Sequence, residues 1–412
     1  DPDHIKNVKK LWILCWENGY IYKGEHQGWY SISDETFYPE SKVVELREGG
    51  GEIALKDTVI DSRRKYINTE TRNEVLHQSE TNYFFRLSAF QKKLIEYIEQ
   101  NPQFIHPPNK RDQILHDLKE NPLQDLSISR PASRLKWGID VPNDSEQKVY
   151  VWFDALCNYL TSVGGIDAVK HNTHVSLAHS TLSTTENTRG WWENTTHLIG
   201  KDIAKFHTVY WPSFLMAADL PLPKQIVIHG HWLSNGVKMS KSLGNVVDPL
   251  LMISYYGCDS MRWYLLENSR LETDCDFVEE RLHGVRELLS SKWGNLINRC
   301  CGPKFNLARG VSTFNNRSPE ELSQILTEGP TRKAFESLVS QLDELPGYLH
   351  DHFTQFDTSG PLKQIWSIIN DTNTFVQLSE PWNKKGDEQD LIIYTAMEVA
   401  RILSILSQPI IP

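Results

Sequence analysis

The segment "KVYVWFDALCNYL", residues 148–160, decides the fold of this chain. Alternation in its first part predicts a buried strand, with Trp152 and Asp154 on the face opposite to Val151 and Phe153. The apolar residues that follow predict a helix. The segment therefore predicts one strand–helix unit.

Two later segments repeat this pattern. They are "THLIGKDIAKFHTVYWPSFLMAA", residues 196–218, and "KQIVIHGHW", residues 224–232. Strands that alternate with helices predict a parallel α/β sheet, whose ligands bind beyond the carboxyl ends of the strands. The residues expected at those ends are Trp152, Asp154, Gly200, Lys201, Asp202 and His229.

The composition is that of a globular chain with more than one domain. The chain has 412 residues, of which 39% are hydrophobic and 23% charged, and this length predicts two or three domains. No run approaches the ~20 apolar residues of a membrane span, so we expect no membrane partner. The net charge of −10 argues against coating nucleic acid through bulk charge, but not against a folded RNA bound by local basic patches.

Neither cysteines nor histidines form a convincing metal motif. The six cysteines include no C-x-x-C pair, so zinc-knuckle spacing is missing, and their scatter predicts reduced intracellular thiols. His171, His174 and His179 lie in a Ser/Thr-rich stretch, residues 164–190. They could be imagined as metal ligands, but a solvated surface loop is the favoured interpretation.

The remaining segments predict two flanking regions. Residues 5–16 have helical spacing that ends at Gly19, and residues 21–43 are short aromatic runs typical of small antiparallel strands. Apolar spacing in residues 282–297 and 391–406 predicts a C-terminal α-helical bundle.

The segment "GVKMSKSLGNV", residues 236–246, has the composition of a phosphate-binding loop. Lys238 and Lys241 are three residues apart, so both ammonium groups can reach one polyphosphate. Ser240 and Ser242 add small donors. From composition alone, a solvated turn with incidental lysines is an equally good interpretation.

The order of residues resembles a known family. "KMSKS" is the ATP-loop motif of class I aminoacyl-tRNA synthetases, and the chain resembles their methionyl branch almost throughout. The blocks "YVWFDALCNYL", "HLIGKDIAKFH", "HGHWLSNGVKMSKSLGN" and "GCDSMRWYLL" occur in that family's order. The stretch "GWYSISDETFYPESKV" is similar to the accessory domain of zinc-free members, with fungal mitochondrial enzymes nearest. The resemblance implies a location in the mitochondrial matrix.

The resemblance implies an α/β fold: a partial class I Rossmann-like catalytic domain with an inserted accessory domain and a C-terminal α-helical anticodon-binding bundle. The expected parts are residues 1–125 (connective or accessory domain), 126–233 (second half of the catalytic domain), 234–285 (KMSKS loop and linking domain) and 286–412 (anticodon-binding domain).

The resemblance also assigns roles to residues. The expected catalytic residues are Lys241, Lys238, Ser240 and Ser242, and the expected ATP-binding residues are Lys238, Met239, Lys241, Gly200, His229 and Gly230. The expected methionine-binding residues are Trp152, Asp154, Ala155, Tyr159, Ile203, Phe206, His207, Asp202 and Arg130. Ile203, Phe206, His207 and Tyr210 also fit one helix face, which a plain core stripe would explain as well.

The implied RNA contacts lie near the C-terminus. Asn295 and Arg299 are spaced i, i+4, and Trp382 follows a proline and precedes two lysines. Singly, each has an ordinary structural interpretation. Together they match the family's readers of the CAU anticodon, where amide, guanidinium and indole groups contact bases.

The implied function is that of a methionine–tRNA ligase with methionine, ATP as its Mg²⁺ complex and tRNA(Met) as partners, no zinc, and a monomeric state. The family's His-Ile-Gly-His motif is absent, and "HGHW" at residues 229–232 is no displaced copy. We therefore expect that the chain begins after that motif and is inactive as given.

Two alternatives remain. Another class I synthetase, such as the leucyl or cysteinyl enzyme, is disfavoured by the aromatic pocket set and the Asn–Arg–Trp trio. A non-catalytic tRNA-binding protein on the same scaffold would leave Lys238 and Lys241 free to drift, yet both are present.

Overall fold

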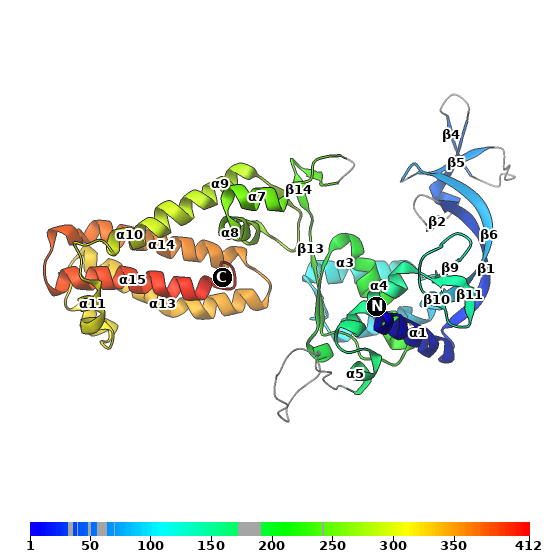
Figure 1. The fold of residues 1–412 in the computed structure, drawn as a ribbon, viewed down its shortest axis with the longest axis horizontal. Coiled ribbons are helices and arrows are strands. Elements are labelled where there is room, and N and C mark those ends of the chain that lie inside the picture. The colour runs from blue at the N-terminus through cyan, green and yellow to red at the C-terminus, as the bar shows by residue number, and fades with distance from the viewer. Residues whose placement is uncertain are drawn as a thin grey trace. The chain divides into compact units, whose positions relative to one another are not determined.

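The computed structural model describes residues 1–31, 36–38, 40–47, 51–55, 64–69, 71–171, 191–240 and 243–412. The chain divides into two compact units, Asp1–Ile228 and His229–Pro412 (Figure 1). The finer division into four parts stays a prediction. No helix within the described ranges is long and apolar enough to cross a membrane.

The first unit opens with helix α1 (Pro2–Glu17), which begins at a capping Asp1 and buries Val8, Leu11, Trp12 and Cys15. Gly19 follows with a φ of +79°, a left-handed conformation that glycine adopts without strain. The predicted first helix and its end are confirmed.

A long antiparallel pair then forms the centre of a seven-stranded sheet, and the short antiparallel strands that the aromatic runs predicted are present. Strands β1 (Ile21–Ser31) and β6 (Glu74–Phe85) lie side by side over most of their length (Figure 1). The sheet is completed by β2 (Thr36–Tyr38), β3 (Val43–Leu46), β4 (Glu52–Ala54), β5 (Lys65–Asn68) and β8 (Leu126–Ser127).

The predicted α/β sheet contains three strands in the order β12 (Thr196–Gly200), β13 (Gln225–His229), β7 (Ile105–His106). Strands β13 and β7 are parallel. Helices α2 (Gln91–Gln100), α3 (Pro108–Glu120), α4 (Val151–Ser162), α5 (Ile166–His171) and α6 (Trp211–Ala217) complete this part of the unit. The α/β class is confirmed.

The strand predicted in "VYVWF" is wrong. Strand β11 (Asp144–Val149) ends at the first residue of this segment, and α4 already starts at Val151. The buried residues of α4 are Phe153, Leu156, Cys157 and Leu160. They are spaced i, i+3, i+4 and i+7, which is the period of a helix. The strand-like alternation in "VYVWF" covers only five residues, and over so few positions it can arise by chance.

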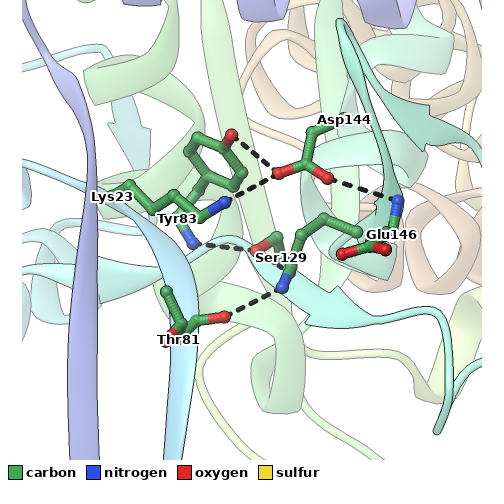
Figure 2. Close-up of polar contacts among 7 residues, drawn as sticks. Lys23, Thr81, Tyr83, Ser129, Asp144 and Glu146 are labelled. Atoms are coloured by element: carbon green, nitrogen blue, oxygen red, sulfur yellow. Dashed lines mark hydrogen bonds and ion pairs between the residues drawn. The ribbon is translucent and has the colours of Figure 1, made fainter.

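A polar network joins the β1–β6 strand pair to the three-stranded sheet of β9 (Ser129–Pro131), β10 (Asp140–Val141) and β11 (Figure 2). Asp144 Oδ2 accepts hydrogen bonds from Lys23 Nζ and the Tyr83 hydroxyl, both at 2.9 Å. Its Oδ1 accepts the Glu146 N–H at 3.2 Å. Buried Ser129 Oγ accepts the Tyr83 N–H at 2.8 Å. The carboxylate of Asp144 therefore joins three segments.

The hydrogen bonds of Asp144 make the free energy of unfolding depend on pH. The Lys23 ammonium, above all, and the Tyr83 hydroxyl hold the pKa of Asp144 below its ordinary value of 3.8, although burial opposes them. A depressed folded-state pKa means that the stabilisation is complete above the ordinary value and is lost as the pH falls below it.

We expect Asp144→Asn to lower the free energy of unfolding by about 1–2 kcal/mol at neutral pH, because charge-assisted hydrogen bonds are lost. The deficit relative to the unsubstituted protein should shrink near pH ~3. Urea unfolding at both pH values measures it. Asp167→Asn is the control, since Asp167 pairs with Lys10 at an exposed site and should change stability little. A deficit of equal size at both pH values would contradict the prediction.

The second unit begins with a small sheet of β14 (Trp232–Ser234), β15 (Val237–Lys238) and β16 (Cys275–Phe277). Helices follow to the end: α7 (Pro249–Tyr256), α8 (Cys258–Asn268), α9 (Glu279–Leu288), η6 (Leu289–Gly294), α10 (Asn295–Cys300), α11 (Leu307–Phe314), α12 (Pro319–Ser323), α13 (Pro330–Thr354), α14 (Ser359–Ser379), η7 (Pro381–Asn383) and α15 (Asp387–Ser407). The predicted α-helical bundle is confirmed.

Three buried indoles pack against one another in this unit. Trp263 of α8 packs against Trp366 of α14 at a centroid distance of 4.9 Å and against Trp293 of η6 at 6.1 Å. Buried Asp390 of α15 pairs with Arg309 of α11. Helices α10 and η7 both pack against α15, so α15 supports both of them.

Candidate functional site

An aromatic cluster occupies the predicted methionine site in the first unit. Trp152 of α4 stacks on Phe206 of η5 (Phe206–Tyr210), with ring centroids 3.8 Å apart and planes 13° apart. His207 approaches Trp152 edge-on at 6.3 Å, and Tyr159 lies two turns along α4. The helix start at Val151 thus places Trp152 and Tyr159 on one side of α4, next to η5.

The protonation of His207 follows from its two hydrogen bonds. Its ring is 1% exposed, with Nδ1 3.0 Å from the Ile203 carbonyl oxygen and Nε2 2.8 Å from the Tyr159 hydroxyl. A carbonyl can only accept, so Nδ1 carries the hydrogen and Nε2 accepts from Tyr159. Burial lowers the pKa of His207, although the Ile203 contact opposes the shift. The imidazole is therefore neutral at neutral pH.

The tyrosines of this cluster stay protonated. Burial raises the pKa of Tyr159. Burial, with nearby Tyr150, raises the pKa of Tyr210 to about 12. The cluster is therefore an uncharged aromatic site with two tyrosine hydroxyls and the His207 imidazole, suited to a side chain that is apolar and polarizable.

The polar residues predicted for the headgroup contact residues outside the cluster or are exposed. Asp154 Oδ1 lies 2.6 Å from Nε2 of His4 in α1. Arg130 donates to Ser127 Oγ at 2.9 Å and to the Ser129 carbonyl at 2.8 Å, and lies over the Tyr150 ring. Asp202, in the 3₁₀ turn η4 (Lys201–Ile203), and Ala155 of α4 are exposed.

Sequence reasoning missed His4. Its other ring nitrogen lies 3.0 Å from Thr161 Oγ1, so His4 links α1 to two points on α4. The sequence separation of about 150 residues carries no periodic signal, and only the packing of α1 on α4 shows the pair.

The lysine loop in the second unit follows a tight hairpin. Asn235 and Gly236 connect β14 to β15 with φ values of +53° and +73°, which the mirror-image turns of two-residue hairpins require. The Gly236 N–H donates to Asp276 Oδ1 on β16 at 3.1 Å. Lys238 is the last residue of β15 and is exposed, and Met239 packs partly against the core of this unit.

Asn245, another residue without a predicted role, braces this loop. Its Oδ1 accepts the Ser240 N–H at 2.9 Å, and its Nδ2 donates to the Lys238 carbonyl at 3.2 Å. Lys241 and Ser242 lie outside the described residues. The backbone around Met239 is thus held on both sides by one amide side chain.

The other residues predicted for ATP belong to strand ends. Gly200 ends β12 in the first unit, whereas His229 and Gly230 belong to the second unit. His229 Nδ1 lies 2.7 Å from the Gly230 carbonyl oxygen. A Cβ on Gly230 would lie 2.2 Å from the Thr273 carbonyl oxygen, so only glycine fits there.

The predicted anticodon residues lie on the surface of the helical unit. Asn295 and Arg299 are both exposed, at the start and near the end of α10. Trp382 lies in η7 and is 43% exposed, so it is not a core tryptophan. Gln389 of α15 donates to the Pro381 carbonyl at 2.7 Å, which fixes the turn that presents this indole.

The structure thus brings Trp152, Phe206, Tyr159, His207 and Ile203 together in direct contact. Three histidines were considered as metal ligands. His174 and His179 lie outside the described residues, and the side chain of His171 is not described. Within the described ranges, no three His, Cys, Asp or Glu side chains gather as a metal-binding set.

Comparisons with known proteins give the family. The model of the family "tRNA synthetases class I (M)" matches residues 1–301. The mitochondrial methionine--tRNA ligase of Saccharomyces cerevisiae is 57% identical, over all of this chain and 71% of its own length. The corresponding enzyme of Candida albicans is 43% identical, over all of this chain and 72% of its own length. A Mycobacterium tuberculosis methionyl-tRNA synthetase structure bound by methionyl-adenylate is 32% identical with a TM-score of 0.78, covering all of this chain and 74% of that one.

The α/β fold and the lysine loop, together with these matches, define a tRNA synthetase of class I. Within that class, the chain belongs to the methionyl-tRNA synthetase family. The predicted ligase function and the mitochondrial assignment are confirmed, because the two relatives are named mitochondrial methionine--tRNA ligases. Another class I specificity and a non-catalytic role are not supported.

Proposed function

We propose that three parts of the chain carry out the function of a methionine–tRNA ligase. The aromatic cluster of the first unit binds methionine, the lysine loop binds ATP, and the exposed face of the helical unit binds the anticodon of tRNA(Met). In the first reaction the methionine carboxylate attacks the α-phosphorus of ATP. A phosphorus–oxygen bond to the carboxylate forms, and the bond to the leaving pyrophosphate breaks. ATP enters as its Mg²⁺ complex.

The observation that carries this proposal is the contact set of Trp152, Phe206, Tyr159 and His207. Tyr159 and His207 share a hydrogen bond, and His207 Nδ1 is bonded to the Ile203 carbonyl, so the site offers ring faces rather than charges. A thioether gains about 0.3–1.5 kcal/mol from each aromatic contact. A smaller or branched side chain would reach fewer ring faces.

Around this pocket, Arg130, Asp154 and Asp202 are proposed to serve the amino-acid headgroup, with Ala155 leaving room beside them. Asp154 would act together with His4, because the 2.6 Å contact already fixes the carboxylate. A carboxylate in place can attract the methionine ammonium, and a guanidinium can orient the attacking carboxylate.

For ATP, the lysine loop would neutralise charge that moves onto the leaving pyrophosphate. Lys241 is proposed to stabilise that charge and Lys238 to assist it. Within the second unit, Met239, Ser240, Ser242, His229 and Gly230 would line the nucleotide, and the role of Gly200 in the first unit stays a prediction. Asn245 supports this role, because it holds the backbone next to Lys238.

For tRNA, Asn295 and Arg299 would hydrogen-bond bases of the CAU anticodon, and Trp382 would stack on one of them. The exposure of all three side chains supports this proposal. The monomeric state stays a prediction.

The pocket is tested by Trp152→Ala and His207→Ala in the enzyme expressed from its complete reading frame. We expect the KM for methionine to rise about tenfold in each variant, because ring contacts worth about 0.5–1.5 kcal/mol apiece are lost. The KM for ATP should stay unchanged. Methionine-dependent pyrophosphate exchange measures both constants.

Trp137→Ala is the matched control, since Trp137 is 85% exposed and lies outside the proposed pocket. It should leave both constants unchanged. If Trp152→Ala and His207→Ala leave the KM for methionine at its original value, the pocket assignment is wrong.

A further inference from the structure

A second histidine, His197 of β12, lies behind the proposed pocket. It is 3% exposed. Its ring centroid lies 4.1 Å from that of Tyr159, with 41° between the planes, and 5.9 Å from that of His207. Trp192 closes its other side at 6.1 Å. His197 is therefore wedged between the Tyr159–His207 pair and the core.

Packing alone would favour an apolar ring at position 197 rather than a histidine. Its Nε2 is buried and has no hydrogen-bond partner among the described residues. An unpartnered buried nitrogen lowers stability, whereas an apolar ring of the same shape would not. Burial, and secondarily nearby His207, lowers the pKa of His197 to about 4, so the ring is neutral at neutral pH.

The Tyr159–His207 hydrogen bond depends on where Tyr159 lies. His207 cannot adjust to a displaced hydroxyl by turning its ring over, because the Ile203 carbonyl already takes its Nδ1 hydrogen. Among the described residues, the ring closest to Tyr159 is that of His197. If this ring were absent, Tyr159 could lean into the space, and its hydroxyl would leave His207 Nε2.

We propose that His197 is a positioning residue of the methionine pocket: its ring holds Tyr159 in the place where the tyrosine hydroxyl meets His207. This role rests on the proposed methionine pocket. His197 itself does not touch the substrate but sets the distance between two side chains that do.

The test compares His197→Ala with His197→Phe in the enzyme expressed from its complete reading frame. The alanine variant should raise the KM for methionine about fivefold, as expected for the loss of one aromatic pair, with the KM for ATP and kcat within about twofold. The phenylalanine variant keeps the ring, so its KM for methionine should stay near the original. It should also raise Tm, because the unpartnered nitrogen is gone.

Ile199→Ala is the matched control, because Ile199 lies two residues along β12 and is similarly buried. It should lower Tm as His197→Ala does but leave the KM for methionine unchanged. A purely structural role for His197 would instead move Tm and all kinetic constants together in both alanine variants, and would overturn the proposal.

Two other results separate the inference from the proposed function. If Trp152→Ala raises the KM for methionine but His197→Ala does not, His197 has no positioning role and the pocket stands. If none of these variants changes that KM, the pocket itself is misplaced. A phenylalanine variant as impaired as the alanine variant, with Tm preserved, would show that the nitrogen acts rather than the ring, and would also overturn the proposal.

Discussion

Replacing Lys241 by alanine is expected to lower the rate of methionyl-adenylate formation by about 10²–10³-fold at saturating ATP, with little change in methionine affinity. The leaving pyrophosphate gains negative charge in the transition state, and an ammonium group placed beside it stabilises that state more than the ground state. In the proposed site, the ground-state contacts of methionine are made by the aromatic cluster instead. The loss should therefore fall on kcat.

Pyrophosphate exchange measures this rate, and equilibrium binding of methionine gives the affinity. Lys238→Ala should have the same kind of effect but a smaller one, since Lys238 is proposed only to assist Lys241. Lys333→Ala is the matched control, because Lys333 is an exposed lysine of α13 in the same unit, and it should leave the rate unchanged. A Lys241→Ala enzyme with an unaltered exchange rate would rule out the proposed role of the loop.

Replacing Trp382 by alanine is expected to lower kcat/KM for tRNA(Met) about 10- to 100-fold while adenylate formation stays intact. The expected size comes from base–aromatic stacking, worth about 1–3 kcal/mol per base. Trp382 lies in a short turn that Gln389 of α15 fixes. Because the turn is already ordered before RNA binds, no stacking energy is lost in ordering it.

Aminoacylation and pyrophosphate exchange, measured on the same preparation, separate the two steps. Ile405→Ala serves as the control, because Ile405 is a 50% exposed apolar residue of α15 in the same unit, and both steps should stay unchanged. Equal losses in both steps with Trp382→Ala would indicate a folding defect rather than a lost base contact.

The two parts of the reaction depend on different kinds of structure. Methionine would be held by rings whose positions are set by neighbouring rings, so small shifts of Tyr159 or His207 alter the pocket. The lysine loop depends on backbone contacts from Asn245 and on the hairpin at Gly236. Substitutions behind the rings should therefore affect methionine affinity, and substitutions in the loop should affect the rate.

Local periodicity predicted the secondary structure correctly in long segments and incorrectly in a short one. The helix over residues 391–406 and the end of α1 at Gly19 were predictable, because several turns repeat the same spacing or a glycine is required. "VYVWF" was not, since five residues fit a strand and the first turn of α4 equally well. Only burial of Phe153 with Leu156 and Cys157 decides for the helix.

The sequence by itself determined the α/β class, the order of the motifs and the chemical types in the lysine loop, because these depend on residues that are neighbours along the chain. Tertiary structure alone decided that His4 pairs with Asp154, that His207 carries its hydrogen on Nδ1, and that His197 backs Tyr159. The His4–Asp154 and His197–Tyr159 contacts join residues that lie far apart in the sequence. Their partners are chosen by packing, which brings side chains to within hydrogen-bonding or ring-contact distance irrespective of their separation in sequence.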